Sequence, residues 1–235
     1  MPSVFDNFYS RIFCSELSTE RTAMIDLSYK TPSFYFSDQI TLCGLTATGR
    51  STISRDLYRI KMVLGDDHLM RCVSAGSIAK RMAKQLGMTI EEFTRYSINV
   101  NNDVDRITDE ETANYGRQNM AIIEGRLVPM LCPHSYKVKL IRALKKRAEC
   151  RMMTPEFKGK SLRGVMDAIE QRDENDRERF QKMYTGYEWG EDKFDLVIDT
   201  GSIDEISTMR LIEKSHEAWR NHMTASGHEV RWTIM

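Results

Sequence analysis

The 235-residue sequence contains few cysteines and histidines, and neither type of residue is spaced for a metal site or a disulfide framework. The five cysteines lie far apart and none forms a C-x-x-C pair, so they predict neither disulfides nor a zinc site. Two of them, Cys43 and Cys72, fall in apolar, strand-like runs, and we expect both to be buried in the core. The five histidines lack ligand spacing, and we interpret them as scattered surface residues.

The sequence also lacks an excess of charge and a long apolar run. Lys and Arg number 34, and so do Asp and Glu. The resulting net charge of zero argues against a general binder of nucleic acid or of anionic membranes. No apolar run is long enough to span a membrane, and the N-terminus has no signal-peptide pattern. Together with the unpaired cysteines, these absences predict a soluble, reduced protein of the cytoplasm.

The strongest motif lies in residues 40–52, which read as a buried strand, a tight loop and the start of a helix. It has the form G-x-x-x-x-G-[K/R]-[ST], with Arg50 where the strict motif has Lys. Gly44 allows a sharp exit from the strand, and Gly49 lets the backbone approach an anion closely. The N–H groups ahead of Ser51 would face phosphate oxygens, and its hydroxyl would bind Mg²⁺. Taken alone, the motif fits a ligand-free strand–helix turn equally well.

Short apolar runs alternate with amphipathic stretches along the rest of the chain. Strands are expected over residues 40–43, 71–74, 120–123, 138–141 and 194–198. The principal helices are expected over residues 51–64, 78–86, 101–119, 161–183 and 203–219. This alternation predicts a parallel sheet with right-handed crossovers, in which ligands bind beyond the carboxyl ends of the strands. The phosphate loop and the segments 74–76 and 124–126 all follow strands, so we expect them to meet at that edge.

The helix predicted over residues 161–183 carries a group of charged side chains. Arg172, Asp176 and Arg179 are spaced i, i+4 and i+7 and share a face. Two guanidiniums around one carboxylate would clamp phosphates and read the edge of a base. A solvated face with helix ion pairs explains the same pattern, and the helix alone favours this interpretation. Further basic residues, which would suit phosphoryl transfer, are Lys145, Lys146, Arg147 and Arg151.

The first 38 residues lie outside any phosphate-loop core. Five large apolar side chains recur there at helical spacing, namely Phe5, Phe8, Tyr9, Ile12 and Phe13. Such a stripe predicts a short amphipathic helix that packs on the protein's own core or against a partner. We slightly favour a homodimer through this helix. The predicted organisation is an N-terminal extension (1–38), a nucleotide-binding kinase-like domain (39–222) and a C-terminal tail (223–235).

Taken together, these segments resemble the cytidylate kinase family, and more closely its archaeal-type branch. The likeness covers residues 39–216 and rests on short motifs in a fixed order. They are S-A-G at 74–76, G-M-T-I-E-E-F at 87–93, D-R-x-x-D at 105–109, E-G-R-L at 124–127, R-D-x-x-D-x-x-R at 172–179, and Y-x-G followed by F-D-L-V-I-D-T between 184 and 200. The implied fold is a three-layer α/β P-loop kinase fold with a five-stranded parallel sheet and helical monophosphate-binding and lid segments.

The resemblance implies transfer of the γ-phosphoryl group of ATP to CMP or dCMP, with Mg²⁺ as the cofactor. The loop that would bind ATP consists of Gly44, Leu45, Thr46, Ala47, Thr48, Gly49, Arg50, Ser51 and Thr52. Ser51 would bind Mg²⁺, with Glu124 as an outer-shell carboxylate. The lid arginines, which together with Arg50 would stabilise transition-state charge, would be Arg147, Arg151 and Arg172.

The acceptor site follows from the same resemblance. Arg126 and Arg179 would bind the phosphate of CMP, and Asp176 would accept a hydrogen bond from the exocyclic amine of cytosine. The remaining residues of this site would be Ser74, Gly76 and, nearby, Arg106. Nucleotides are therefore the expected partners.

Several residues depart from the family pattern and keep two alternatives open. Ala79, Lys80 and the stretch 128–130 suggest a related small-molecule kinase with a different acceptor. Arg50 and the apolar N-terminal helix suggest a degenerate kinase fold that acts as a nucleotide-binding or regulatory protein. We rank an active pyrimidine nucleoside monophosphate kinase first.

Overall fold

The computed structural model describes residues 35–36, 39–63, 71–90, 92–93, 103–117, 121–184, 190, 193–226 and 229–230. All of them belong to one compact unit that spans residues 31–235. The predicted N-terminal helix and the homodimer contact through it lie outside the described residues. They stay predictions, as do the domain boundaries at 38/39 and 222/223.

Five strands form one parallel sheet, which confirms the predicted architecture. They are β2 (Ile40–Gly44), β3 (Arg71–Ser74), β4 (Ala121–Glu124), β5 (Tyr136–Ile141) and β6 (Leu196–Asp199). Their order in the sheet is β3-β4-β2-β5-β6. All residues of β2 are buried, as the near-continuous apolar run of a central parallel strand requires. The loop after β2 therefore starts from the middle of the carboxyl edge of the sheet.

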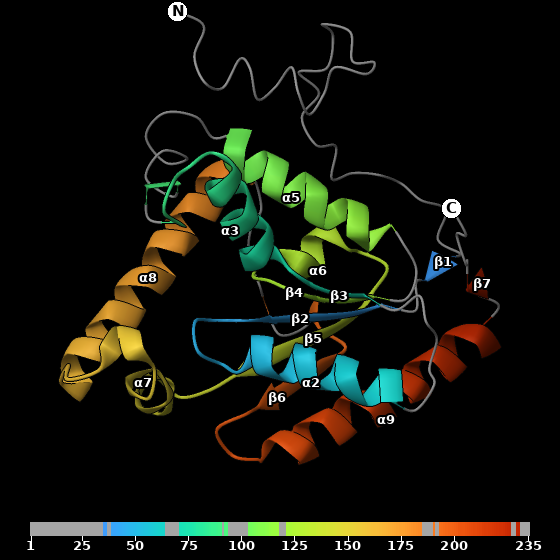
Figure 1. Ribbon diagram of the computed structural model, residues 1–235. Coiled ribbons are helices and arrows are strands. Elements are labelled where there is room, and N and C mark those ends of the chain that lie inside the picture. The colour runs from blue at the N-terminus through green and yellow to red at the C-terminus, as the bar shows by residue number, and fades with distance from the viewer. Residues whose placement is uncertain are drawn as a thin grey trace, which may run out of the picture. The chain divides into compact units, whose positions relative to one another are not determined.

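Helices cover both faces of the sheet and give three layers (Figure 1). One face carries α2 (Arg50–Val63) and α9 (Glu205–Ala225). The other carries the helices α3 (Ala75–Gln85), α5 (Asp103–Gly116) and α6 (Val128–Leu131). Beyond the carboxyl edge lie α7 (Leu144–Met152), the short 3-10 helix η1 (Pro155–Phe157) and the long α8 (Leu162–Met183).

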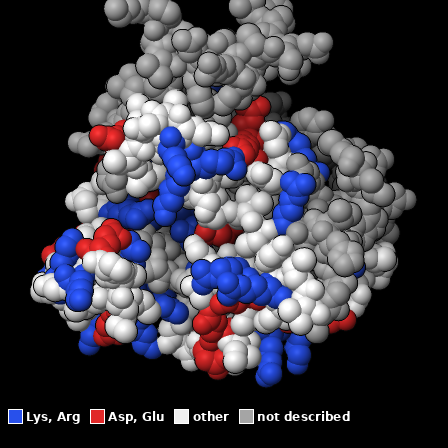
Figure 2. Space-filling model, in the orientation of Figure 1, with Lys and Arg blue, Asp and Glu red and all other residues white. Residues whose placement is uncertain are grey.

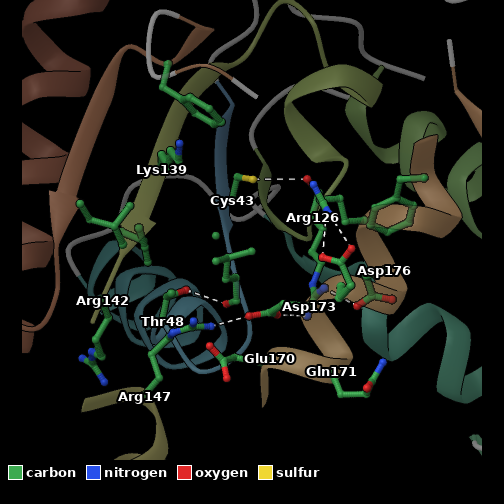
Figure 3. A pocket seen from close by; sticks show the side chains of 18 of the residues that line it. Cys43, Thr48, Arg126, Lys139, Arg142, Arg147, Glu170, Gln171, Asp173 and Asp176 are labelled. Atoms are coloured by element: carbon green, nitrogen blue, oxygen red, sulfur yellow. Dashed lines mark hydrogen bonds and ion pairs between the residues drawn. The ribbon is translucent and has the colours of Figure 1, made fainter. Parts of the chain in front are cut away.

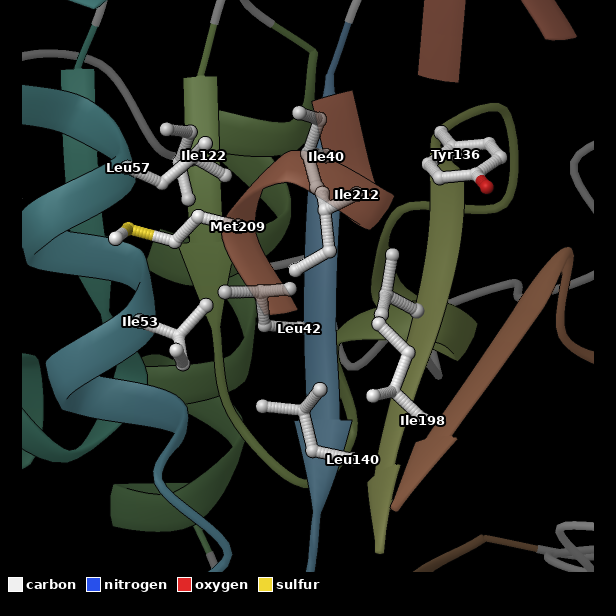
Figure 4. Close-up of a cluster of buried hydrophobic side chains, with 11 residues drawn as sticks. Ile40, Leu42, Ile53, Leu57, Ile122, Tyr136, Leu140, Ile198, Met209 and Ile212 are labelled. Carbon is white, nitrogen blue, oxygen red and sulfur yellow. The ribbon is translucent and has the colours of Figure 1, made fainter. Parts of the chain in front are cut away.

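The main core lies between the sheet and the α2–α9 layer (Figure 4). The strands contribute Ile40, Leu42, Ile122, Tyr136, Val138, Leu140 and Ile198, and the two helices contribute Ile53, Leu57, Met209 and Ile212. Burial of one such large side chain stabilises the fold by about 1.5–3 kcal/mol. A second, separate cluster consists of Ala148, Phe157, Val165 and Ile169. It joins α7, η1 and α8 into a unit with its own small core.

The ends of the chain contain structure that the sequence did not indicate. The last helix continues to Ala225 instead of ending at Trp219. Strand β1 (Tyr35–Phe36) pairs in parallel with β7 (Glu229–Val230), so the end of the predicted N-terminal extension lies beside part of the predicted C-terminal tail. None of the described helices is long and apolar enough to cross a membrane.

Two predictions about burial were wrong. Cys72 is exposed, because β3 is an edge strand of the sheet, whereas Cys43 on the central strand is buried as expected. His216 is buried rather than superficial, because it falls on the inward stripe of α9. Its ring stacks on Trp219 with centroids 5.9 Å apart and lies 5.3 Å from the ring centroid of Tyr136.

Candidate active site

The loop after β2 has a backbone shape that only certain residues permit. Gly44 has φ of +155°, and a Cβ there would lie 2.4 Å from the Leu140 carbonyl oxygen and 2.6 Å from Thr48 Oγ1. Gly49 has φ of +94°. Ala47, at +62°, is the only residue other than glycine with a positive φ in the described part of the chain. Such strain concentrates at ligand-binding turns, and this loop is therefore a candidate site.

The loop leads directly into the N-terminus of α2. The amides of Thr52 and Ile53 donate to the Gly49 carbonyl oxygen, so the helix begins as the loop ends. The first turn of α2 contains no acidic residue. A helix N-terminus without a carboxylate of its own favours a bound anion.

The end of β6 holds the loop in place. The Thr200 hydroxyl donates to the Thr48 carbonyl oxygen at 2.8 Å. Arg142, after β5, donates to the hydroxyl of Thr200 at 3.1 Å and to its carbonyl oxygen at 2.7 Å. Arg142 was not predicted to be a site residue. Its position directly after a strand at the carboxyl edge is the signal that would have found it.

A buried carboxylate lies where the loop, β3 and β4 meet. Glu124, 4% exposed, accepts hydrogen bonds from the hydroxyls of Ser51 at 2.8 Å and Ser74 at 2.5 Å. The guanidinium of Arg50 lies 3.7 Å from its second oxygen. Three segments that are distant in sequence therefore meet at this carboxylate, as their positions after strands predicted.

A second carboxylate, Asp173 of α8, contacts the phosphate loop itself (Figure 3). Its Oδ1 accepts from the amide of Thr46 at 3.1 Å and from the Thr46 hydroxyl at 2.8 Å. Arg126 donates to the same oxygen at 2.9 Å, and Arg147 donates to Oδ2 at 2.5 Å. These partners hold the pKa of Asp173 below its usual value, although burial opposes the shift. The carboxylate is therefore an anion at the loop.

Asp173 was not predicted to be a site residue. The signal for it is its place four residues after the buried Ile169, on the inward face of α8. A charged residue on a buried face usually has a paired partner. Its partners come from the phosphate loop, from the segment after β4 and from α7, so the sequence of α8 alone cannot identify them.

The carboxylate of Asp176 is framed by two guanidiniums, but one of them differs from the expectation. Arg179 donates to Asp176 at 3.0 Å, and Arg126 forms the other ion pair. Arg172 does not form this frame and is exposed. The reason is that Val165, Ile169 and Phe180 fix the inward face of α8, and Arg172 falls at its margin.

The network continues from α8 to α5. Arg179 lies 3.5 Å from Asp105, and the Tyr184 hydroxyl donates to Asp109. Burial raises the pKa of Asp109 to about 7, while the hydrogen bond from Tyr184 opposes the shift. Three motifs of the family resemblance, at 105–109, 172–179 and 184, therefore meet in space.

The remaining predicted residues lie around this network. Ser74 caps α3 by accepting from the amide of Ser77, and Gly76 is exposed in the first turn of that helix. Arg106 lies on α5, and its positive charge opposes the increase that burial causes in the pKa of the Tyr184 hydroxyl. Arg151 donates to Glu156 at 2.9 Å and lies over the ring of Phe157. It therefore belongs to the α7–η1–α8 unit, and among the described residues no hydrogen bond or ion pair joins it to the loop.

A cavity of about 1140 Å³ opens between the loop, β5 and α8. Its wall includes the arginines Arg126, Arg142 and Arg147 and the carboxylates Asp173 and Asp176 (Figure 3). It is large enough for a nucleotide-sized ligand.

On the face shown in Figure 2, basic and acidic side chains are interleaved over α7 and α8. Basic side chains thus gather locally, although the whole sequence has a net charge of zero.

Comparison of the sequence with known proteins identifies archaeal cytidylate kinases among its relatives. No family model matches the chain. The cytidylate kinase of Pyrococcus furiosus is 30% identical over 163 residues, which are 68% of this chain and 79% of that protein. The cytidylate kinase of Methanocaldococcus jannaschii is 27% identical over 181 residues, which are 75% and 96% of the two chains.

Solved structures resemble the fold. An uncharacterized protein from Eubacterium ventriosum matches with a TM-score of 0.56 at 13% identity, over 77% of this chain and 98% of that one. A gluconokinase from Sinorhizobium meliloti matches with a TM-score of 0.50 at 10% identity, over 83% and 99%. At these identities the structures show similarity of fold alone, and they agree with the three-layer α/β kinase fold. Since the Pyrococcus relative extends over more than two thirds of both chains, this chain belongs to the cytidylate kinase family.

Proposed function

We propose that this protein transfers the γ-phosphoryl group of ATP to a pyrimidine nucleoside monophosphate, CMP or dCMP. The observation that best supports the proposal is the position of Asp176 in the cleft beside the phosphate loop. Its carboxylate is 18% exposed and lies between the guanidiniums of Arg126 and Arg179. A carboxylate accepts hydrogen bonds from an amine on a base, and arginines bind phosphate oxygens in pairs.

On the donor side, the loop of residues 44–52 would bind the phosphates of ATP. Its amides and the start of α2 supply hydrogen-bond donors whose positions are fixed by the fold before a ligand binds. Arg50 and Arg147 would add positive charge where negative charge spreads over the transferring group. Arg147 is suited to this role, because it is 6% exposed and its Nε–H has no hydrogen-bond partner among the described residues.

The residues present fit a magnesium ion at the start of α2. The Ser51 hydroxyl and the Glu124 carboxylate lie 2.8 Å apart, and hard oxygen ligands of this kind suit Mg²⁺. Within the described residues, no three His, Cys, Asp or Glu side chains form a metal-ligand group. This agrees with a kinase ion that takes one or two protein oxygens and completes its ligands from substrate phosphates. When bound, Mg²⁺ neutralises charge on those phosphates.

On the acceptor side, Arg126 and Arg179 would orient the phosphate of the monophosphate toward ATP. Asp176 would accept from the 4-amino group of cytosine, which uracil lacks. A site built to hydrogen-bond a polar group rejects analogues without it far more strongly than an apolar pocket does. CMP and dCMP should therefore be preferred over UMP.

The test is ADP formation from ATP and Mg²⁺ with CMP, dCMP, UMP, AMP and GMP, each against a reaction without acceptor. We expect the highest kcat/KM with CMP or dCMP. Asp176→Ala should then raise the KM for CMP on the order of a hundredfold and change the KM for ATP by less than about threefold. Asp176→Asn removes the negative charge but keeps nearly the same shape, so it shows which of the two properties the site needs.

Three outcomes would contradict parts of the proposal. A purine monophosphate as the best acceptor would overturn the choice of substrate. Equal effects of Asp176→Ala on both substrates would remove Asp176 from the acceptor site. ATP binding without transfer to any monophosphate would favour a nucleotide-binding protein over an enzyme.

A further inference from the structure

The contacts of Asp173 are those that a phosphate group would make. Its two oxygens receive a loop amide, a loop hydroxyl and two guanidiniums. Amides of this loop and arginines are the donors that bind phosphate in P-loop kinases. An ordinary helix ion pair would join Asp173 to a neighbour on α8. Instead, every one of its described hydrogen-bond partners lies outside α8.

The charges around Asp173 are balanced within the described part of the protein. Three arginines and three aspartates alternate from the loop to α5, in the order Arg147, Asp173, Arg126, Asp176, Arg179 and Asp105. Phosphates that enter this chain of ion pairs bring further negative charge. Each guanidinium has a limited number of N–H donors. Phosphate oxygens can therefore bind these arginines only with donors that the aspartates release.

We propose that Asp173 is a positioning residue that acts as an internal anion on the phosphate loop. Its carboxylate holds Arg126 and Arg147 beside Thr46, and nucleotide phosphates compete with it for these donors. The proposal rests on the proposed function, in that the loop of residues 44–52 must bind phosphates. It goes further, because it assigns two effects to the Asp173 carboxylate. The carboxylate orients Arg126 and Arg147 before the nucleotide binds, and it lowers the affinity for nucleotide phosphates.

Competition and preassembly have opposite effects when the charge is removed. Without the Asp173 carboxylate, phosphate oxygens have the donors to themselves and bind more tightly. Arg126 and Arg147 are then held at the loop only by Thr46, to whose hydroxyl and carbonyl oxygen they respectively donate. The transition state therefore receives less well oriented charge, and kcat falls. A merely structural Asp173 would give the other pattern, in which its loss weakens binding and destabilises the fold.

The experiment is calorimetry of the full chain with ATP–Mg²⁺ and with pyrophosphate, together with kcat and KM for ATP. We expect Asp173→Asn to bind both ligands about tenfold more tightly, which corresponds to the loss of one competing charge-assisted contact. Its KM and kcat should both fall. Asp173→Glu keeps the anion and should stay closer to the wild type than Asp173→Asn does.

Glu178→Gln is the matched control. It removes one negative charge from α8, but Glu178 is exposed and lies outside the wall of the cavity. Its affinity for both ligands should stay within about twofold of the wild type, since exposed charges act weakly at a distance. An equal gain in affinity in Glu178→Gln would attribute the effect to net charge and overturn the proposal.

The failures can be told apart. If the wild type binds neither ligand, the proposed function and this inference both fall. If the wild type binds ATP and Asp173→Asn binds it equally or more weakly, only the inference falls. Denaturant unfolding of each variant verifies that it is folded. If Asp173→Asn does not fold, Asp173→Ser removes the same charge with a smaller side chain and decides the question.

Discussion

At the scale of single residues, Arg50 is the clearest departure from the phosphate-binding motif. The loop around it keeps its glycines, its amides and the start of α2. The longer arginine side chain turns toward β4, where its guanidinium lies 3.7 Å from the Glu124 carboxylate. A lysine presents a compact ammonium, whereas arginine presents a planar fork that binds two oxygens at once. The cradle that we propose for phosphates is thus intact, and only the charge that would reach them differs from the strict motif.

Substitution of Arg50 should affect turnover more than ATP binding. Arg50→Ala removes a charge directed at the transition state and should lower kcat by on the order of a hundredfold. Arg50→Lys should retain or raise kcat, since it restores the strict motif. The measurements are a coupled ADP assay with CMP and calorimetry with ATP–Mg²⁺. Arg55→Ala, one turn along α2 and exposed, is the control. An unchanged kcat in Arg50→Ala would show that Arg50 has no part in the reaction.

Residues that lie at strand ends could be predicted from the sequence, whereas residues defined by long-range pairs could not. Ser74 and Glu124 end strands and Ser51 follows the loop after β2, and the structure joins all three. The partners of Asp173 lie 26 to 127 residues away along the chain. No local pattern contains that information, so the frame around Asp176 was assigned to the neighbouring Arg172 instead of to Arg126.

At the scale of elements, the apolar runs in the sequence were enough to predict the strands of the main sheet. Each of the five predicted strands exists. The bounds of β3 are those expected, and the bounds of the other four differ by one or two residues. The pairing of β1 with β7 could not be foreseen, because each strand has two residues and neither has a periodic pattern. The length of α9 was underestimated, because its last turns, after Trp219, are polar and lack an inward stripe.

The contact between α5 and the end of α8 should make stability depend on pH. Burial raises the pKa of Asp109 to about 7 from its ordinary 3.8. Between these values the folded protein binds a proton that the unfolded chain does not. The stabilising contribution is therefore fully present below about pH 4 and is lost as the pH rises through 7, at about 1.4 kcal/mol for each unit of raised pKa.

Urea unfolding at pH 5 and pH 8 tests this dependence. The wild type should lose about 1–3 kcal/mol more of its unfolding free energy than Asp109→Asn does between the two values. The asparagine keeps an oxygen that accepts from the Tyr184 hydroxyl but does not titrate. The charged neighbours Asp105 and Arg179 are the same in both proteins, so they cancel in the difference. Equal losses in the two proteins would contradict a raised pKa for Asp109.

At the scale of the whole molecule, the described chain has two cores of different size. The larger one lies between the sheet and the α2–α9 layer, and the smaller one joins α7, η1 and α8. The smaller unit contacts the phosphate loop through charged side chains, namely Asp173 and Arg147. Charged contacts can be exchanged for contacts with a ligand, whereas an apolar core cannot. A unit with its own small core and exchangeable contacts with the loop agrees with the lid segment that the family resemblance implies.

The N-terminal segment supplies the last prediction. Its stripe of Phe5, Phe8, Tyr9, Ile12 and Phe13 is too apolar to stay exposed in a monomer, and we expect it to join two copies of the chain. Every site residue named above lies between residues 44 and 200, within the compact unit of residues 31–235. A chain truncated before Thr31 should therefore keep ATP binding and lose self-association. Truncation before Gln39 is less suitable, because it removes β1, which pairs with β7.

Light scattering gives the mass of both chains, and calorimetry gives their affinity for ATP–Mg²⁺. The full chain should have twice the monomer mass, and the truncated chain should have its own single mass with unchanged affinity. A full-length variant with Phe5, Phe8 and Phe13 replaced by Ser is the matched control, since it keeps the length and removes most of the apolar stripe. Each buried phenylalanine contributes about 1.5–3 kcal/mol, so three such losses suffice to dissociate a dimer of ordinary affinity. A full-length chain that is already monomeric would refute the homodimer, and the stripe would then have to pack within one chain.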